Sequence, residues 1–108
     1  MKRKAIPEQT KQWADEVIRE FNERVIRDAN HYLASRYRGS YLYLERLRYG
    51  TAHPVCRLTY TGSQDQWDFA IFKYSDERYD PAEWFFPGAG YVDGTLPGAL
   101  RAALAAYP

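Results

Sequence analysis

Five acidic side chains are concentrated in the last third of the chain. They are Asp76, Glu77, Asp80, Glu83 and Asp93, and the first four lie in the run KYSDERYDPAEWFFPGAG. General acid–base catalysis uses two carboxyl groups held in contrasting environments, so such a cluster is a candidate acid site. A structural interpretation is also open, because acids can cap a helix start or pair with neighbouring cations.

Four consecutive residues of this run have no structural role that the sequence indicates. Asp76, Glu77, Arg78 and Tyr79 follow a predicted strand and precede a signal for the start of a helix. They are therefore a candidate ligand or acid site. A small hydrolase or ligand-binding domain that uses the acids of residues 76–93 is one of three functions that we consider.

The residues that most often hold metals or form covalent intermediates are few. His53 and Cys56 are three positions apart, and residues so spaced on an extended strand point to opposite faces. There is no second cysteine, and His31 is remote in sequence. The glycine pattern of PGAGYVDGT departs from both the dinucleotide-binding and the P-loop motif. The sequence predicts no metal site and no cofactor.

Arginine and tyrosine are interleaved through the middle of the chain, a pattern typical of surfaces that contact phosphates and stack on bases. The residues concerned are Arg38, Arg46, Arg48, Arg57, Tyr41 and Tyr43. They predict a binding surface for RNA or single-stranded DNA as a second function. In the alternative interpretation the tyrosines pack one sheet face against a helix, while the arginines lie in solvent and pair with acids.

The charge distribution allows either interpretation. Residues 1–64 contain twelve Lys/Arg and seven Asp/Glu, whereas residues 65–108 contain three and seven, so the halves carry about +5 and −4. Two such halves attract each other in one fold. The length of 108 residues fits a single domain, residues 1–108, with residues 1–7 as a flexible basic tail. The single cysteine and the absence of an apolar targeting stretch predict a cytoplasmic protein without a membrane partner.

A long amphipathic helix is predicted for residues 7 to about 36. Apolar residues recur there every three or four positions, and charged residues fill the positions between them. Glu20 precedes Arg24 by four residues, an order that supports a helix. Asn30 and His31 are poorer helix formers, so the helix is expected to fray or break near them.

Three strands are predicted after this helix, in SYLYLERLRYG, PVCRLTYTG and WDFAIFKYS, each bounded by turn-forming residues. Their short connections favour an antiparallel meander. For the first of these strands, alternation allows two assignments of the face that packs on the core. Leu42 and Leu44 share a side with Arg46, so either the tyrosine side faces the core or a bulge near Glu45 exchanges the faces.

The remaining chain predicts a capped helical turn and a closing helix. Asp80 followed by Pro81 indicates a short helix or single turn that carries Trp84 and Phe85 toward the core. TLPGALRAALAAYP has helical periodicity with Thr95 as its cap. The predicted fold is α+β: a long N-terminal helix, an antiparallel meander of three to four strands, a short capped turn and a C-terminal helix.

This order of elements, with PVCRLTYTG followed by WDFAIFKYS after a leading helix, resembles small bacterial domains of unknown function that place a β-meander after a helix. The resemblance covers about the middle half of the chain and includes no catalytic motif. It implies the fold and a bacterial cytoplasmic origin, and it carries over no site residues.

A long amphipathic helix on a small sheet leaves one face poorly covered, and symmetric dimers are the commonest solution. Trp13 and Phe21 are the candidate interface residues on that helix. The first function that we consider is therefore a non-enzymatic protein-interaction module, whose partner is a second copy or another protein.

Overall fold

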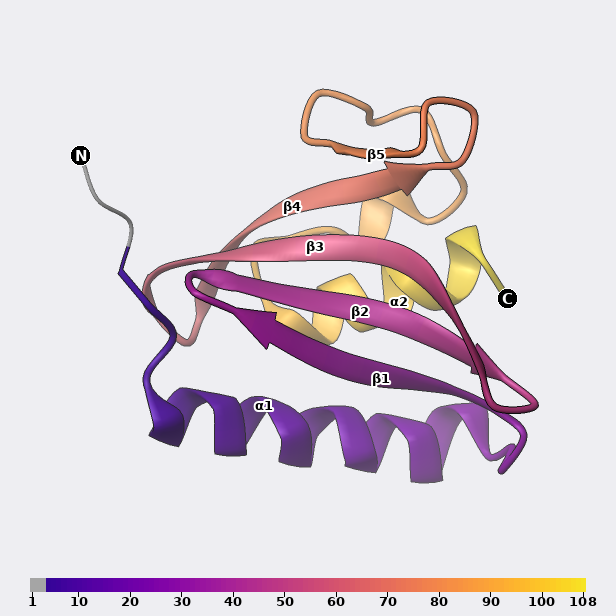
Figure 1. Cartoon of the computed structure of the whole chain (residues 1–108), viewed down its shortest axis with the longest axis horizontal. Coiled ribbons are helices and arrows are strands. Elements are labelled where there is room, and N and C mark those ends of the chain that lie inside the picture. The colour runs from indigo at the N-terminus through magenta and orange to yellow at the C-terminus, as the bar shows by residue number, and fades with distance from the viewer. Residues whose placement is uncertain (1–3) are drawn as a thin grey trace.

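The computed structural model describes residues 4–108, which form one antiparallel sheet and two α-helices (Figure 1). In chain order the elements are α1 (Glu8–Phe21), a π-helical segment (Asn22–Ile26), β1 (His31–Arg38), β2 (Tyr41–Arg48), β3 (Thr51–Ser63), β4 (Gln66–Lys73), β5 (Arg78–Asp80), a 3-10 turn (Ala89–Tyr91) and α2 (Leu96–Ala106). The α+β class is confirmed. The sheet has five strands instead of three to four, in the order β1-β2-β3-β4-β5.

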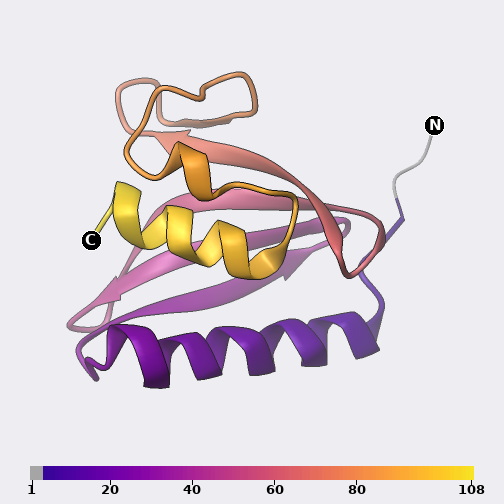
Figure 2. The same ribbon diagram turned by 180° about the vertical axis from the view of Figure 1, so that it is seen from behind.

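Both helices pack against the same face of this sheet. Figure 2 shows α2 across the strands and α1 alongside the β1 edge. One apolar core joins the helix residues Ala14, Ile18 and Leu100 to sheet residues such as Leu58 and Trp67. The domain therefore has two layers, and the described residues place no helix on the second face of the sheet.

The prediction of one helix to about residue 36 is wrong beyond the π-helical segment. Arg27 adopts a left-handed conformation with φ of 57°, which ends the helix. The next strand, β1, buries Leu33 toward the core and pairs along its whole length with β2. The break expected near Asn30 and His31 is therefore the start of an additional strand.

The outer edge of β1 is partly closed by one side chain from the π-helical segment. The Asn22 amide donates to the Leu33 carbonyl at 2.8 Å and accepts from the Leu33 amide at 2.9 Å. This side chain satisfies backbone groups that an exposed edge strand leaves free for another chain. Asn22 also joins the end of the first helix to the sheet.

The face of β2 that packs on the helices carries Leu42, Leu44 and Arg46, all of which are buried. A register irregularity lies between Leu44 and Glu45, as the alternation in the sequence suggested, but the additional residue is Val55 of β3. Alternation in β2 therefore continues without interruption. The tyrosine side of β2 is not the core face.

The segment after β5 forms a turn and an aromatic loop. The Asp80 carboxylate accepts a hydrogen bond from the Ala82 amide at 2.9 Å, so the predicted capped turn forms, as a single turn without a helix. The prediction that it carries Trp84 and Phe85 toward the core is wrong, because Phe85 is 96% exposed and Trp84 is 49% exposed. Phe86 packs on the core instead.

The segment before α1 is attached to the β1–β2 turn, and α2 begins at a side-chain cap. The predicted cap of α2 is confirmed, since the Thr95 hydroxyl accepts from the Gly98 amide at 3.1 Å. Within the tail expected over residues 1–7, residues 1–3 lie outside the described residues, while Ile6 is buried and its amide donates to the Gly39 carbonyl at 3.0 Å.

Candidate functional site

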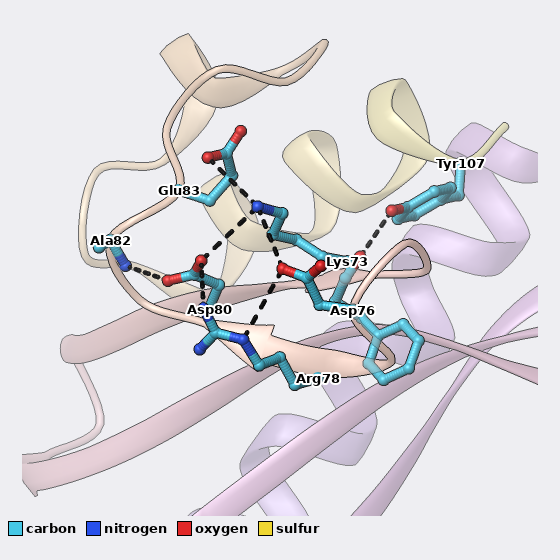
Figure 3. A network of polar contacts seen from close by, with 8 residues as sticks. Lys73, Asp76, Arg78, Asp80, Ala82, Glu83 and Tyr107 are labelled. Carbon is cyan, nitrogen blue, oxygen red and sulfur yellow. Dashed lines mark hydrogen bonds and ion pairs between the residues drawn. The ribbon is translucent and has the colours of Figure 1, made fainter.

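The acidic residues after β4 form an ion-pair network (Figure 3). The Lys73 ammonium lies 3.5 Å from Asp76, 3.8 Å from Asp80 and 3.9 Å from Glu83. Arg78 lies 3.2 Å from Asp80 and 3.8 Å from Asp76. Each of the three carboxylates therefore faces at least one cation, and Asp80, the buried member, also holds the turn that follows β5. This arrangement fits a structural role for the acids.

The four candidate residues 76–79 do not form one site. Asp76 and Arg78 belong to the ion-pair network, whereas Glu77 is exposed at a left-handed turn position with φ of 50°. Tyr79 lies on the other side of the sheet, where its ring centroid is 5.3 Å from that of Tyr43. Asp93, the fifth acid, accepts hydrogen bonds from the amide and hydroxyl of Thr95.

We expect Tyr79 to ionise only in strong alkali, because burial raises its pKa to about 12 from an ordinary value of about 10. The folded protein then retains a proton that the unfolded chain loses, so the contribution to stability is complete below pH 10 and is lost as the pH rises to 12. Phenolate absorbance, compared between the native protein and Tyr79→Phe, measures this titration. A Tyr79 titration at the ordinary pKa would contradict it.

The second face of the sheet, which we call the open face, is lined by alternating residues of all five strands. These residues are Arg36, Arg38, Tyr41, Tyr43, Glu45, Leu47, Arg57, Thr59, Asp68, Phe72 and Tyr79. Most of those near its centre are half-buried although no helix of residues 4–108 covers them. They shield one another from water by close packing.

Guanidinium groups stack on the tyrosine rings at the centre of the open face. Arg57 Cζ lies 4.5 Å from the ring centroid of Tyr41 and 5.5 Å from that of Tyr79, and Arg36 Cζ lies 4.3 Å from that of Tyr43. Arginine over an aromatic ring is stabilised by the negative charge of the ring face. The side chains of this face are therefore held in a fixed arrangement.

The charges of the open face have both signs. Arg36, Arg38 and Arg57 supply the positive charge, and Glu45 and Asp68 supply the negative charge. Arg36 Nε lies 3.7 Å from the Glu45 carboxylate. The net charge of these residues is close to +1, which is small for a surface that must neutralise several phosphates.

Two arginines that the sequence pattern grouped with this surface lie elsewhere. Arg46 and Arg48 alternate with Glu45 and Leu47, so they are on the helix-covered side of β2. Arg46 is 6% exposed, and burial together with the charge of Arg48 lowers its pKa. The structure therefore divides the predicted nucleic-acid set: Arg38, Arg57, Tyr41 and Tyr43 share the open face, and Arg46 and Arg48 do not.

The two candidate interface residues of α1 contact the domain's own core. Trp13 and Phe21 are partly buried and pack against the apolar cluster between the layers. Cys56 is fully buried, and burial raises the pKa of its thiol. Among residues 4–108, no group of three or more His, Cys, Asp or Glu side chains is placed to hold a metal ion.

Two features of the surface were not predicted from the sequence. The first is the extent of the open face. Arg36 belongs to the interleaved Arg/Tyr pattern but was assigned to a helix, and it reaches this face because residues 31–38 form a strand; Tyr79 reaches it because residues 78–80 form β5. The aromatic loop of Trp84, Phe85 and Phe86 is the second feature, and these rings border a shallow hollow. The strand that carries Arg36 is indicated in the sequence by the alternation within HYLASRYR, residues 31–38.

Comparison with known proteins adds no relative from which a function could be proposed: no protein-family model, no curated protein and no solved structure matches the chain. Within residues 4–108, no helix is both long enough and apolar enough to cross a membrane. The fold and site together define a two-layer α+β domain with one helix-covered face and one Arg/Tyr-lined face.

Proposed function

We propose that this protein is a non-enzymatic protein-interaction module that forms a homodimer through the open face. The observation that supports the proposal is the composition of that face: a half-buried aromatic centre, stacked arginines and no helical cover within the described chain. Tyrosine and arginine are enriched in the energetically dominant positions of protein interfaces. Their fixed packing also lowers the conformational entropy that binding would cost.

A second copy of the chain is the partner that the charges favour. In a two-fold symmetric contact each patch meets its own copy, so a face that carries both signs can oppose its arginines to its own carboxylates. Arg38 and Asp68 are the exposed residues available for such pairs, near opposite edges of the face. Two sheets packed face to face, with helices outside, would cover the tyrosine centre.

Binding of RNA or single-stranded DNA is less well supported. The guanidinium groups of Arg36 and Arg57 occupy tyrosine ring faces on which bases would stack. Arg46 and Arg48, two of the four arginines expected to contact phosphates, are on the other side of the sheet. A hydrolase is supported less still, because Asp76, Asp80 and Glu83, three of the acids that would do its chemistry, are ion-paired.

The proposal predicts a concentration-dependent dimer, measured by size-exclusion chromatography with light scattering. Tyr43→Lys with Leu47→Lys places one charge in the tyrosine centre of the open face and a second farther along β2. The double variant should weaken dimerisation at least about a hundredfold, since it removes an aromatic anchor and buries charge. Tyr91→Lys is the matched control, because Tyr91 is 52% exposed beside α2 in the helix layer. Circular dichroism checks that the variants fold.

A monomer at high micromolar concentration would overturn the homodimer. Equal weakening by Tyr91→Lys would place the interface elsewhere. Saturable binding of single-stranded RNA by a monomer, with a steep loss on addition of salt, would support the nucleic-acid alternative instead.

A further inference from the structure

A cavity of about 250 Å³ lies on the helix-covered side of the sheet, where the β2–β3 hairpin approaches the end of α2. It is lined by Arg46, Arg48, His53, Val55, Tyr74 and Tyr107. Two of these side chains, Arg46 and Arg48, carry a permanent positive charge. None of these lining residues is acidic.

Arg46 makes this cavity unusual. Its side chain is 6% exposed, and its Nε and Nη1 atoms are buried without a hydrogen-bond partner among the described residues. A buried guanidinium is normally paired with a carboxylate, because burial of an unpaired charge is costly. Asp28 acts on Arg46 from a distance, but its carboxylate is already bonded to the His31 ring and the Asn30 amide.

The aromatic walls of the cavity are fixed by hydrogen bonds to the backbone. The Tyr74 hydroxyl donates to the Pro54 carbonyl and the Tyr107 hydroxyl donates to the Phe72 carbonyl, each at 2.6 Å. The two rings meet edge to face with centroids 5.3 Å apart. Arg48 is held by a hydrogen bond to the Pro108 carbonyl oxygen. The cavity is therefore preorganised, and Arg46 is the cation whose hydrogen-bonding capacity is unused.

We propose that this cavity binds a small aromatic phosphate monoester, with the phosphate against Arg46 and Arg48 and the ring against Tyr74 and Tyr107. A phosphate monoester carries nearly two negative charges at neutral pH, which matches two arginines better than a single carboxylate does. The volume is slightly below the range of drug-sized ligand sites, which fits a one-ring molecule. The site is separate from the open face and does not depend on dimerisation.

The test uses phenyl phosphate, titrated into the native protein by calorimetry at constant ionic strength. Saturable binding is expected, at least about tenfold tighter than that of either inorganic phosphate or benzoate, because only phenyl phosphate satisfies both the arginines and the rings. Arg46→Met should weaken this binding at least about tenfold while its melting temperature stays equal or rises, since an apolar side chain of similar length removes a buried unpaired charge.

Arg24→Met is the matched control, because Arg24 is exposed on the π-helical segment and does not line the cavity, and the affinity of this variant should stay within about twofold of the native value. No saturable binding of phenyl phosphate would overturn the proposal. So would equally tight binding of benzoate, or an unchanged affinity in folded Arg46→Met.

Discussion

Gly88→Ala should lower the free energy of unfolding by about 3 kcal/mol, which is large for the addition of one methyl group. Gly88 has a φ of 93°, in a region that residues with a side chain rarely adopt. A Cβ at this position would lie 2.7 Å from the Ala105 Cβ and 2.9 Å from the Ala102 carbonyl oxygen, both on α2. Neither neighbour is a flexible side chain that could move aside. The variant therefore combines backbone strain with overpacking.

Two other glycines separate these causes. Gly62→Ala has a similar φ of 105° with no atom within 4 Å of the added Cβ, so it should cost about 1–2 kcal/mol through strain alone. Gly90→Ala has open space and no positive φ, so it should stay within about 0.5 kcal/mol of the native protein. Urea unfolding measures all three variants. If Gly88→Ala cost no more than Gly62→Ala, close packing on α2 would not be the cause.

The close approach at Gly88 also explains how the aromatic loop is held. The loop returns from β5 and touches α2 at Gly88, and between these points Phe86 stacks on Phe69 with ring centroids 5.9 Å apart. Trp84 also lies beside Phe69, at 6.0 Å. Because the residues on either side of Phe85 both contact Phe69, the Phe85 side chain points into solvent.

The parts of the fold that the sequence predicted are those set by local signals. The cap at Thr95 acts on an amide three residues away, and the three strands found from alternation are bounded by turn residues. Such signals involve neighbours in the chain. They therefore do not depend on which distant elements come together.

The sequence did not predict the strand β1, because this strand is stabilised by pairing with β2 and not by signals within its own residues. Leu33 continues the helical spacing of Ala29, and its neighbours Ser35 and Tyr37 on the core side are a hydroxyl and a phenol that bond to Asp15. Because two of the three inward residues are polar, the alternation of apolar and polar residues that indicates a strand is weak here. The strand becomes favourable only when β2 pairs with it, and tertiary context then overrides helical propensity.

The sequence predicted only part of the candidate binding surface, because the faces of the strands and the elements that cover them depend on tertiary packing. Alternation in β2 places Arg46 on the leucine side, so the arginines of the interleaved pattern could not all share one face. Tyr79 reaches the open face only because β5 adds a fifth strand beside Phe72. Whether either face is covered depends on where the helices pack, and periodicity within one element does not contain that information.

Trp67→Ala should have the largest effect on stability, a loss of about 4 kcal/mol from a total that is about 5–15 kcal/mol for a domain of this kind. Trp67 is 2% exposed, its ring lies 5.4 Å from that of Tyr60, and its Nε1 donates to the Gln64 carbonyl at 2.8 Å. Removing it leaves a cavity and an unsatisfied carbonyl. Trp84→Ala is the control and should cost about 2 kcal/mol, because half of that side chain is already in water.

The reason for this difference is the position of Trp67 between the two layers. Its backbone amide donates to the Gly94 carbonyl at 2.7 Å, immediately before α2, so β4 and the start of α2 are joined at the residue whose side chain fills the core. Trp67→Phe, which keeps most of the volume but not the indole donor, should recover more than half of the loss. Equal destabilisation by Trp67→Ala and Trp84→Ala in urea would mean that the core between sheet and α2 is not what stabilises the fold.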